Sequence, residues 1–208
     1  HPILCQALPG GQNDSVSVAP TLELLQAQGL KHLTMVMDRG MTAKANVERA
    51  RAAEYHVVGC VRGWNETTVS YAAQWPGDEL EQQAHIVATS HEHAVYARAF
   101  TAPLMGFENI RIAVVESLVQ KAQERQARDL LLQELEGPVN KQRCKELCAE
   151  LGRVISPCKG RRGFRVDPAA LERERSLDGR FLLFSTDLSL DGRQMYETYF
   201  AKDTIEKV

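Results

Sequence analysis

Short apolar runs alternate with periodic helical segments in the first third of the chain. The clearest run, residues 33–37, reads Leu-Thr-Met-Val-Met, stops at Asp38, and is followed by Gly40, where the backbone can turn away. An apolar run of this length with polar neighbours is typical of a strand buried on both faces. In chain order the pattern predicts a strand at 2–8, a helix that Gly29 ends, the strand at 33–37, a helix at 42–55 and a strand at 55–61. This β-α-β-α-β order favours a layered α/β sheet.

The pattern changes after about Trp64, where Gly and Pro recur and the predicted strands become short. These strands cover residues 85–88, 94–100 and 109–115. Two polar helices follow at 117–136 and 141–151, which together resemble an αα-hairpin, and then a short charged helix at 167–175. The α/β pattern resumes with a strand at 181–186 and a helix from about residue 192 to the end. We therefore expect an α/β core interrupted by an insertion from about residue 65 to about residue 177.

Asp38 and Glu206 are the two acids that this arrangement singles out. An acid at the carboxyl end of a sheet strand lies where ligands bind in α/β proteins, although it can equally cap the next helix or tighten the turn. On the final helix, Tyr199, Lys202 and Glu206 follow one another at spacings of three and four, so they share one side. A lone Glu on a polar helix is usually a solvated surface residue. Because Mg²⁺ commonly needs only one or two protein carboxylates, Asp38 and Glu206 together suggest a metal site.

Composition narrows the class of protein. The apolar and charged fractions, 44% and 25%, are those of an ordinary globular protein, and the formal net charge of −2 gives no global attraction to nucleic acid. Five Cys residues, an odd number without regular spacing, indicate reduced thiols and a cytoplasmic location. No apolar run approaches the ~20 residues of a membrane helix, and no secretory leader opens the chain.

Three blocks of the sequence carry a resemblance to a known family. Residues 9–14 resemble a Gly-Asn-x-x-Asp turn; residues 36–41, with Asn46 and 55–59, resemble the block around a second catalytic acid; and residues 178–186, with Tyr199-x2-Lys202-x3-Glu206, resemble the block around a third. In these blocks the chain is similar to the RNase H-like DDE transposases of bacterial insertion sequences, in the branch with the signature Tyr-x2-Arg-x3-Glu-x6-Lys. The resemblance implies an RNase H-like layered core in residues 1–64 and 178–208 and a large α+β insertion in residues 65–177. Lys202 stands where the signature has Arg, which keeps the charge but loses the bidentate fork.

The resemblance also implies a function, namely metal-dependent cleavage and strand transfer of DNA at insertion-sequence ends. Asp38 and Glu206 would be the catalytic metal ligands for two Mg²⁺ (or Mn²⁺) ions, and Tyr199 and Lys202 would contact the DNA backbone. The partners would be double-stranded DNA, as transposon ends and target, and a second copy of the chain on that DNA, with a nucleoid-associated location in a bacterial cytoplasm. The family's first catalytic Asp belongs on a strand that would precede His1, so we expect these 208 residues alone not to cut DNA.

Three other clusters hold residue types that bind phosphate or metal ions: a basic segment, a His pair and a Cys pair. The basic segment 159–165 is a candidate phosphate contact, with a solvated loop as the alternative; its cations are Lys159, Arg161, Arg162 and Arg165. His91 and His93 have no third metal ligand nearby in the sequence, and Cys144 and Cys148 do not match zinc-site spacing, so we assign neither pair to a metal.

Two alternatives to a transposase stay open. The chain would be a non-catalytic, transposase-derived module for DNA binding or protein interaction if no acid-bearing strand precedes His1. It would be another RNase H-like nuclease if the shared core chemistry serves a reaction other than transposition. The coding sequence just upstream of His1 discriminates the first alternative.

Overall fold

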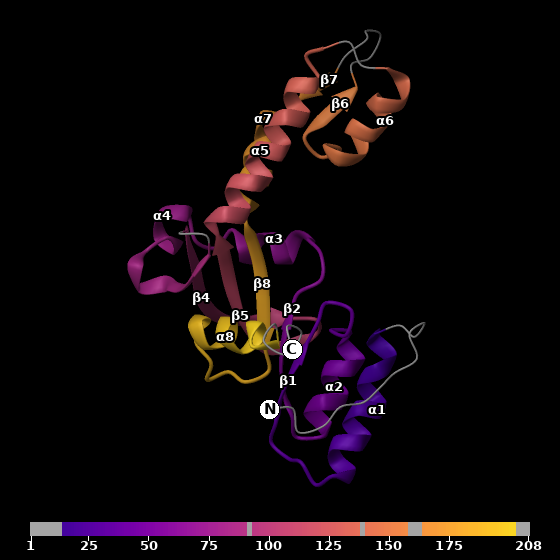
Figure 1. Cartoon of the computed structure of the whole chain (residues 1–208), viewed down its shortest axis with the longest axis vertical. Coiled ribbons are helices and arrows are strands. Elements are labelled where there is room, and N and C mark those ends of the chain that lie inside the picture. The colour runs from indigo at the N-terminus through magenta and orange to yellow at the C-terminus, as the bar shows by residue number, and fades with distance from the viewer. Residues whose placement is uncertain (1–13, 91–92, 138–139, 158–163, 203–208) are drawn as a thin grey trace.

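The computed structural model describes residues 14–90, 93–137, 140–157 and 164–202 (Figure 1). Its centre is a six-stranded mixed sheet with the order β1-β2-β8-β5-β4-β3. The strands of this sheet are β1 (Thr34–Met37), β2 (His56–Cys60), β3 (Ile86–Ser90), β4 (His93–Leu104), β5 (Phe107–Ser117) and β8 (Arg180–Ser185). The helices are α1 (Asp14–Ala27), α2 (Lys44–Ala52), α3 (Glu66–Ala72), α4 (Gly77–Leu80), η1 (Gln83–His85), α5 (Leu118–Glu134), α6 (Lys141–Glu150), α7 (Pro168–Leu177) and α8 (Gly192–Phe200). Mixed α/β architecture, as the sequence predicts, is confirmed.

Among the strands of the described residues, only the β1–β2 pair is parallel, with Thr34 opposite His56 and Met37 opposite Gly59. A parallel pair needs a crossover, which α2 supplies. The other neighbours are antiparallel, and β4 and β5 form a long hairpin that turns at Met105 and Gly106, both with positive φ. Strand β8 returns from late in the chain and is inserted between β2 and β5. The two halves of the sheet are therefore joined by the strand that the sequence places after the insertion.

The sheet has a hydrophobic core on each face because successive strand residues point to opposite sides. On β8, Leu182 and Phe184 face the core that α1, α2 and α3 cover, whereas Leu183 faces the core under α8. Helix α8 contributes Met195 and Tyr199 to that second core, one helical turn apart. The face under α8 is thus the side of the sheet on which Met195 and Tyr199 pack against the strands.

A separate unit projects from the sheet, and we call it the distal unit, residues 118–177. Helices α5 and α7 run side by side away from the sheet and carry α6 and the two-stranded sheet of β6 (Ile155–Pro157) and β7 (Phe164–Val166) at their far end (Figure 1). A third cluster of buried residues, including Leu147, Leu151 and Val154, forms its own small core. The αα-hairpin pattern that the sequence suggests therefore projects from the sheet rather than lying over it.

The central sheet crosses the boundary that the sequence analysis placed at residue 65. Strands β3, β4 and β5, all within the segment 65–177, are hydrogen-bonded members of the same sheet as β1, β2 and β8. The part that leaves the sheet begins only at α5. The predicted strand at 2–8 lies outside the described residues.

The base of the distal unit is fixed by two buried ionic clusters. At the C-cap of α7, just before β8 begins, Asp178, with a side chain 1% exposed, accepts hydrogen bonds from Arg125 and Arg128 of α5. On the neighbouring strands, Arg180 of β8 pairs with Glu116 of β5, and Lys121 of α5 donates to Glu116 at 2.8 Å. Both clusters tie α5 to β8, so the helix leaves the sheet in a defined direction.

Candidate functional site

Three predicted site residues meet where β1 ends against α8. The Tyr199 hydroxyl donates a hydrogen bond to Asp38 Oδ1 at 3.1 Å, and Lys202 Nζ donates to the same oxygen at 2.8 Å. Lys202 Nζ also lies 3.3 Å from the Tyr199 hydroxyl oxygen and 4.4 Å from the centre of the Tyr199 ring. We call this group, Asp38 with Tyr199 and Lys202, the Asp38 site. The site joins Asp38 to Tyr199 and Lys202, which lie 161 and 164 positions further along the sequence.

The β1 side of the site is held by a short turn. The Asp38 carbonyl accepts a hydrogen bond from the Met41 amide at 2.8 Å, and Asn46 of α2 donates to the Met41 carbonyl at 3.0 Å. The N-cap of α2 is Ala43, which makes no side-chain capping bond. Asp38 therefore does not cap the following helix, and the capping alternative is wrong, whereas the place of Asp38 at the start of this turn agrees with the other alternative.

The α8 side is held by tight packing on the sheet. Asp191 and Gln194 form a capping box at the start of the helix. A Cβ on Gly192 would lie 2.8 Å from the Ala97 carbonyl oxygen of β4, so a residue without a side chain is required for this close approach. Tyr199 is 7% exposed, and its ring packs edge-on against Phe200 at a centroid distance of 5.2 Å. The phenol that contacts Asp38 is consequently a fixed group.

The electrostatics of the site favour a charged carboxylate beside a charged ammonium. The hydrogen bond from Lys202 lowers the pKa of Asp38 below its usual value, the Tyr199 bond lowers it further, and partial burial opposes both. Burial alone would lower the pKa of Lys202, but its bonds to Asp38 and Tyr199 outweigh that effect and raise it. Burial raises the pKa of Tyr199, so the phenol keeps its proton at neutral pH.

Solvent reaches this site from the carboxylate side. The Asp38 side chain is 60% exposed, whereas the Lys202 side chain is only 24% exposed. The ammonium is therefore held between the carboxylate and the buried ring, and the carboxylate is the group that a ligand from solution meets first.

Two residues beside the site were not singled out by the sequence. Arg39 Nε donates a hydrogen bond to the Sγ of Cys60 at 3.1 Å, and Cys60 is 2% exposed. This hydrogen bond raises the pKa of Arg39. The signal that could have found them is register: Met37 pairs with Gly59 in parallel strands, so the residues that follow each strand must be neighbours. Arg39 places a second cation next to Asp38.

The described residues include one more predicted site residue, Arg165, and they do not bring it to the Asp38 site. Glu206, Lys159, Arg161 and Arg162 lie outside the described residues. Arg165 is exposed on β7, opposite Ser156, at the far end of the distal unit from α8 (Figure 1). Within the described ranges, no group of three or more His, Cys, Asp or Glu side chains could hold a metal ion.

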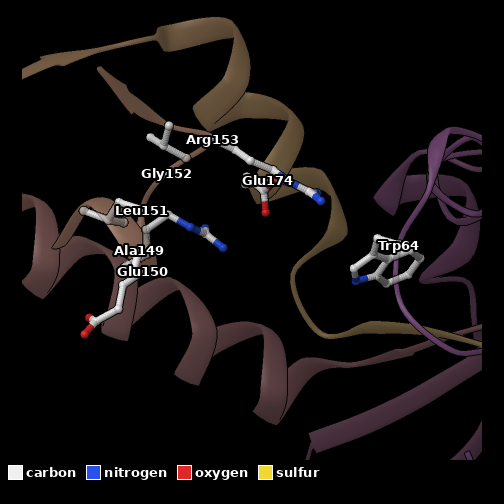
Figure 2. Close-up of a pocket in the computed structure, with 9 residues that line it drawn as sticks. Trp64, Ala149, Glu150, Leu151, Gly152, Arg153 and Glu174 are labelled. Atoms are coloured by element: carbon white, nitrogen blue, oxygen red, sulfur yellow. Dashed lines mark ion pairs between the residues drawn. The ribbon is translucent and has the colours of Figure 1, made fainter. Parts of the chain in front are cut away.

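A cleft of about 410 Å³ lies elsewhere, between the core and the distal unit. Figure 2 shows Trp64 facing Arg153 and Glu174 across it; these last two form a loose ion pair at 3.7 Å. Arg128 also lines the cleft, but its guanidinium already pairs with Asp178. The cleft therefore does not coincide with the group of residues that the sequence identifies.

Comparison of the chain with protein-family models, with curated proteins and with solved structures found no match. Among the helices in the described residues, none combines the length and apolar character needed to cross a membrane. The geometry of the Asp38 site and the sequence motif that contains its members are therefore the features from which a function can be inferred.

Proposed function

We propose that this chain belongs to a metal-dependent DNA transposase, and that the Asp38 site is half of the centre at which a DNA phosphodiester reacts. The observation that carries the proposal is the meeting of Asp38, Tyr199 and Lys202. The sequence motif singles out these residues from two distant blocks, and the fold brings them within 3.3 Å of one another. A chance match of short motifs gives no reason for such contact.

The donor chemistry of the site fits a divalent cation. Asp38 is a mostly exposed carboxylate that already attracts a cationic group, and carboxylate oxygen is the ligand that Mg²⁺ and Mn²⁺ prefer. By the resemblance, Glu206 would supply the second carboxylate from the same helical side as Tyr199 and Lys202. Bound divalent ions would stabilise the attacking and leaving oxygens of a phosphodiester during hydrolysis or strand transfer.

The chain's own residues would position these groups. Tyr199 orients the Asp38 carboxylate through its hydroxyl, because the ring is buried and cannot turn freely. Lys202 carries a positive charge suited to a phosphate oxygen, and Arg39 adds a second cation beside the carboxylate. The site would thereby hold a phosphate near the metal ligands without any base-specific contact.

The proposal includes the finer fold and the partners. We assign β1, α2, β2 and α8 to an RNase H-like core; the parallel β1–β2 pair and helices on both faces of the sheet support this assignment. The distal unit, residues 118–177, would be the inserted part, and its β6–β7 end, which carries Arg165, would contact DNA phosphates. The substrate would be double-stranded DNA, bound by a homodimer in the nucleoid.

The test compares Asp38→Asn with a matched control, Asp129→Asn, an exposed acid of α5 that pairs with Arg175 at 3.4 Å. Binding of Mn²⁺ is measured by electron paramagnetic resonance. Fe²⁺ with ascorbate then reports location, since hydroxyl radicals cut the polypeptide next to the bound ion. We expect cuts near residues 38 and 199, at least ten-fold weaker Mn²⁺ binding in Asp38→Asn, and no change in Asp129→Asn.

The proposal is overturned if Asp38→Asn binds Mn²⁺ as the unaltered chain does, or if the cuts lie elsewhere. Because the resemblance places a further acid before His1, these readouts use metal binding rather than DNA cleavage. DNA binding that is strong, independent of metal and unaffected by Asp38→Asn would instead support the non-catalytic DNA-binding module.

A further inference from the structure

The ammonium of Lys202 occupies the side of Asp38 on which a cation can bind. Lys202 Nζ is 2.8 Å from Asp38 Oδ1, close enough for a charge-assisted hydrogen bond. A compact cation at this distance neutralises the carboxylate and competes with any other cation for the same oxygen. The motif assigns Lys202 to the DNA backbone, but in the structure Lys202 contacts Asp38, the acid that the motif assigns to the metal.

Lys202 has a second resting place when Asp38 is taken by another cation. Its Nζ lies 4.4 Å from the centre of the Tyr199 ring and 3.3 Å from the hydroxyl oxygen, and neither contact requires Asp38. Because Tyr199 is 7% exposed and packed on Phe200, the ring stays in place while the four-carbon stem of Lys202 can turn. Loss of the carboxylate would therefore redirect the ammonium rather than release the whole side chain.

The Asp38–Lys202 pair is weak enough to be exchanged. The Asp38 side chain is 60% exposed, and exposed ion pairs of this kind shift an equilibrium by about two- to five-fold. A divalent cation carries twice the charge of the ammonium and approaches from the solvent side of the carboxylate. Exchange at Asp38 is consequently within reach of millimolar metal.

We propose that Lys202 is a displaceable counter-cation: it neutralises Asp38 when no divalent ion is bound, and on metal binding it is transferred to a DNA phosphate. Metal binding and DNA binding are thereby coupled, because one ammonium serves both partners in turn. This inference rests on the proposed function, since it takes Asp38 as a metal ligand and DNA as the substrate. It adds a role for Lys202 that phosphate contact alone does not contain.

The first test measures Mn²⁺ affinity without DNA in Lys202→Met, which keeps an unbranched side chain as long as the lysine stem and removes the ammonium and its charge. We expect Mn²⁺ to bind about two- to five-fold more tightly than to the unaltered chain, because the competing cation is gone. The matched control is Lys44→Met. Lys44 also has a carboxylate partner, Glu48 at 3.6 Å, and an aromatic neighbour, Phe107, but it lies outside the Asp38 site.

The second test measures how the affinity for a random-sequence 30-base-pair duplex depends on salt, with and without Mn²⁺. One additional phosphate contact steepens the plot of log K against log salt by about 0.9. We expect this steepening on addition of Mn²⁺ in the unaltered chain and in Lys44→Met, and its loss in Lys202→Met.

The outcomes separate this inference from the proposed function. If neither the unaltered chain nor Asp38→Asn binds Mn²⁺, both fail together. If the unaltered chain binds Mn²⁺ and Asp38→Asn does not, the proposed function stands. Lys202→Met with unchanged or weaker Mn²⁺ affinity, or with the same salt dependence as the unaltered chain, then overturns the counter-cation role alone.

Discussion

The buried pair of Glu116 and Arg180 is predicted to hold the centre of the sheet and the base of the distal unit together. The side chains are 1% and 4% exposed, and the two residues are direct neighbours on β5 and β8. Arg180 also donates to the carbonyls of Ala72 and Trp75 at 2.7 and 2.9 Å, and Lys121 donates to both Glu116 and Glu81. Four elements, β5, β8, α3 and α5, therefore converge on one network of two acids and two cations.

Replacement of Glu116 by Leu should destabilise the protein strongly. It leaves Arg180 buried without its carboxylate, and removal of one partner of a buried pair costs about 3–5 kcal/mol. For a chain of this length each kcal/mol lowers the melting temperature by roughly 2–4 °C, so a decrease of about 6–20 °C is expected. The double variant Glu116→Leu with Arg180→Met removes both charges, and we expect it to lose at least about 2 kcal/mol less than the sum of the two single variants.

The assay is urea unfolding followed by far-ultraviolet circular dichroism, with midpoint and slope fitted for each variant. Glu48→Gln serves as the control, because Glu48 belongs to an ion pair that is about half exposed and should change stability by less than about 1 kcal/mol. The reasoning is refuted if Glu116→Leu costs no more than this control, or if the two single losses simply add in the double variant.

Three further predictions concern the site, the backbone and pH. Tyr199→Phe removes the hydroxyl that donates to Asp38 while keeping the ring; the free energy of unfolding should fall by about 1 kcal/mol and the pKa of Asp38, followed by carboxyl NMR titration, should rise. Gly179→Ala should lower the free energy of unfolding in urea by more than about 2 kcal/mol, because φ is +69° and the new Cβ would lie 2.5 Å from a backbone oxygen. Gly29→Ala, where φ is +70° but no atom lies within 4 Å of the new Cβ, should lower it by only about 1 kcal/mol. Burial alone would raise the pKa of Glu116, but side-chain hydrogen bonds with Glu81, Lys121 and Arg180 outweigh it and hold that pKa below its usual value. The resulting stability is present above about pH 4.3 and is lost as pH falls through the lowered value. An acid dependence of stability that is identical in Glu116→Leu would contradict this.

Local patterns predicted the elements that carry the Asp38 site. The apolar run at residues 33–37 and the spacing of three between Tyr199 and Lys202 are short-range signals, and the structure forms a strand and a helix there. The long helix after Ser117 was equally visible, and Ser117 caps it by accepting from the Gln120 amide. These signals depend only on residues within one or two turns of each other.

Sheet membership could not be predicted in the same way. Strands β4 and β5 carry apolar runs that suit a strand of the central sheet and equally a strand of a separate sheet, so their pattern fits both arrangements. The deciding contact is between β5 and β8, where Arg111 pairs with Ser185 across 74 positions of sequence (185 − 111). Glu116 and Arg180 gave no signal either, because a charged residue at a strand end is usually solvated, whereas here each is buried among partners that are distant in the sequence.

The sheet order explains why two distant motifs can form one site. Helix α8 is the next element after β8, and β8 lies beside β2, which in turn lies beside β1. The helix packs across this face, from Gly192 beside Ala97 of β4 to Tyr199 beside Asp38, the residue after β1. The position of Lys202 on Asp38 is thus a consequence of where β8 is inserted, and that insertion is stabilised by the pairing of Arg180 with Glu116. A substitution that loosens this pair should change the geometry of the Asp38 site through β8 and α8, although no atom of the pair touches the site. Substitutions in the small core around Leu147 in the distal unit should move neither the strand nor the helix of the site.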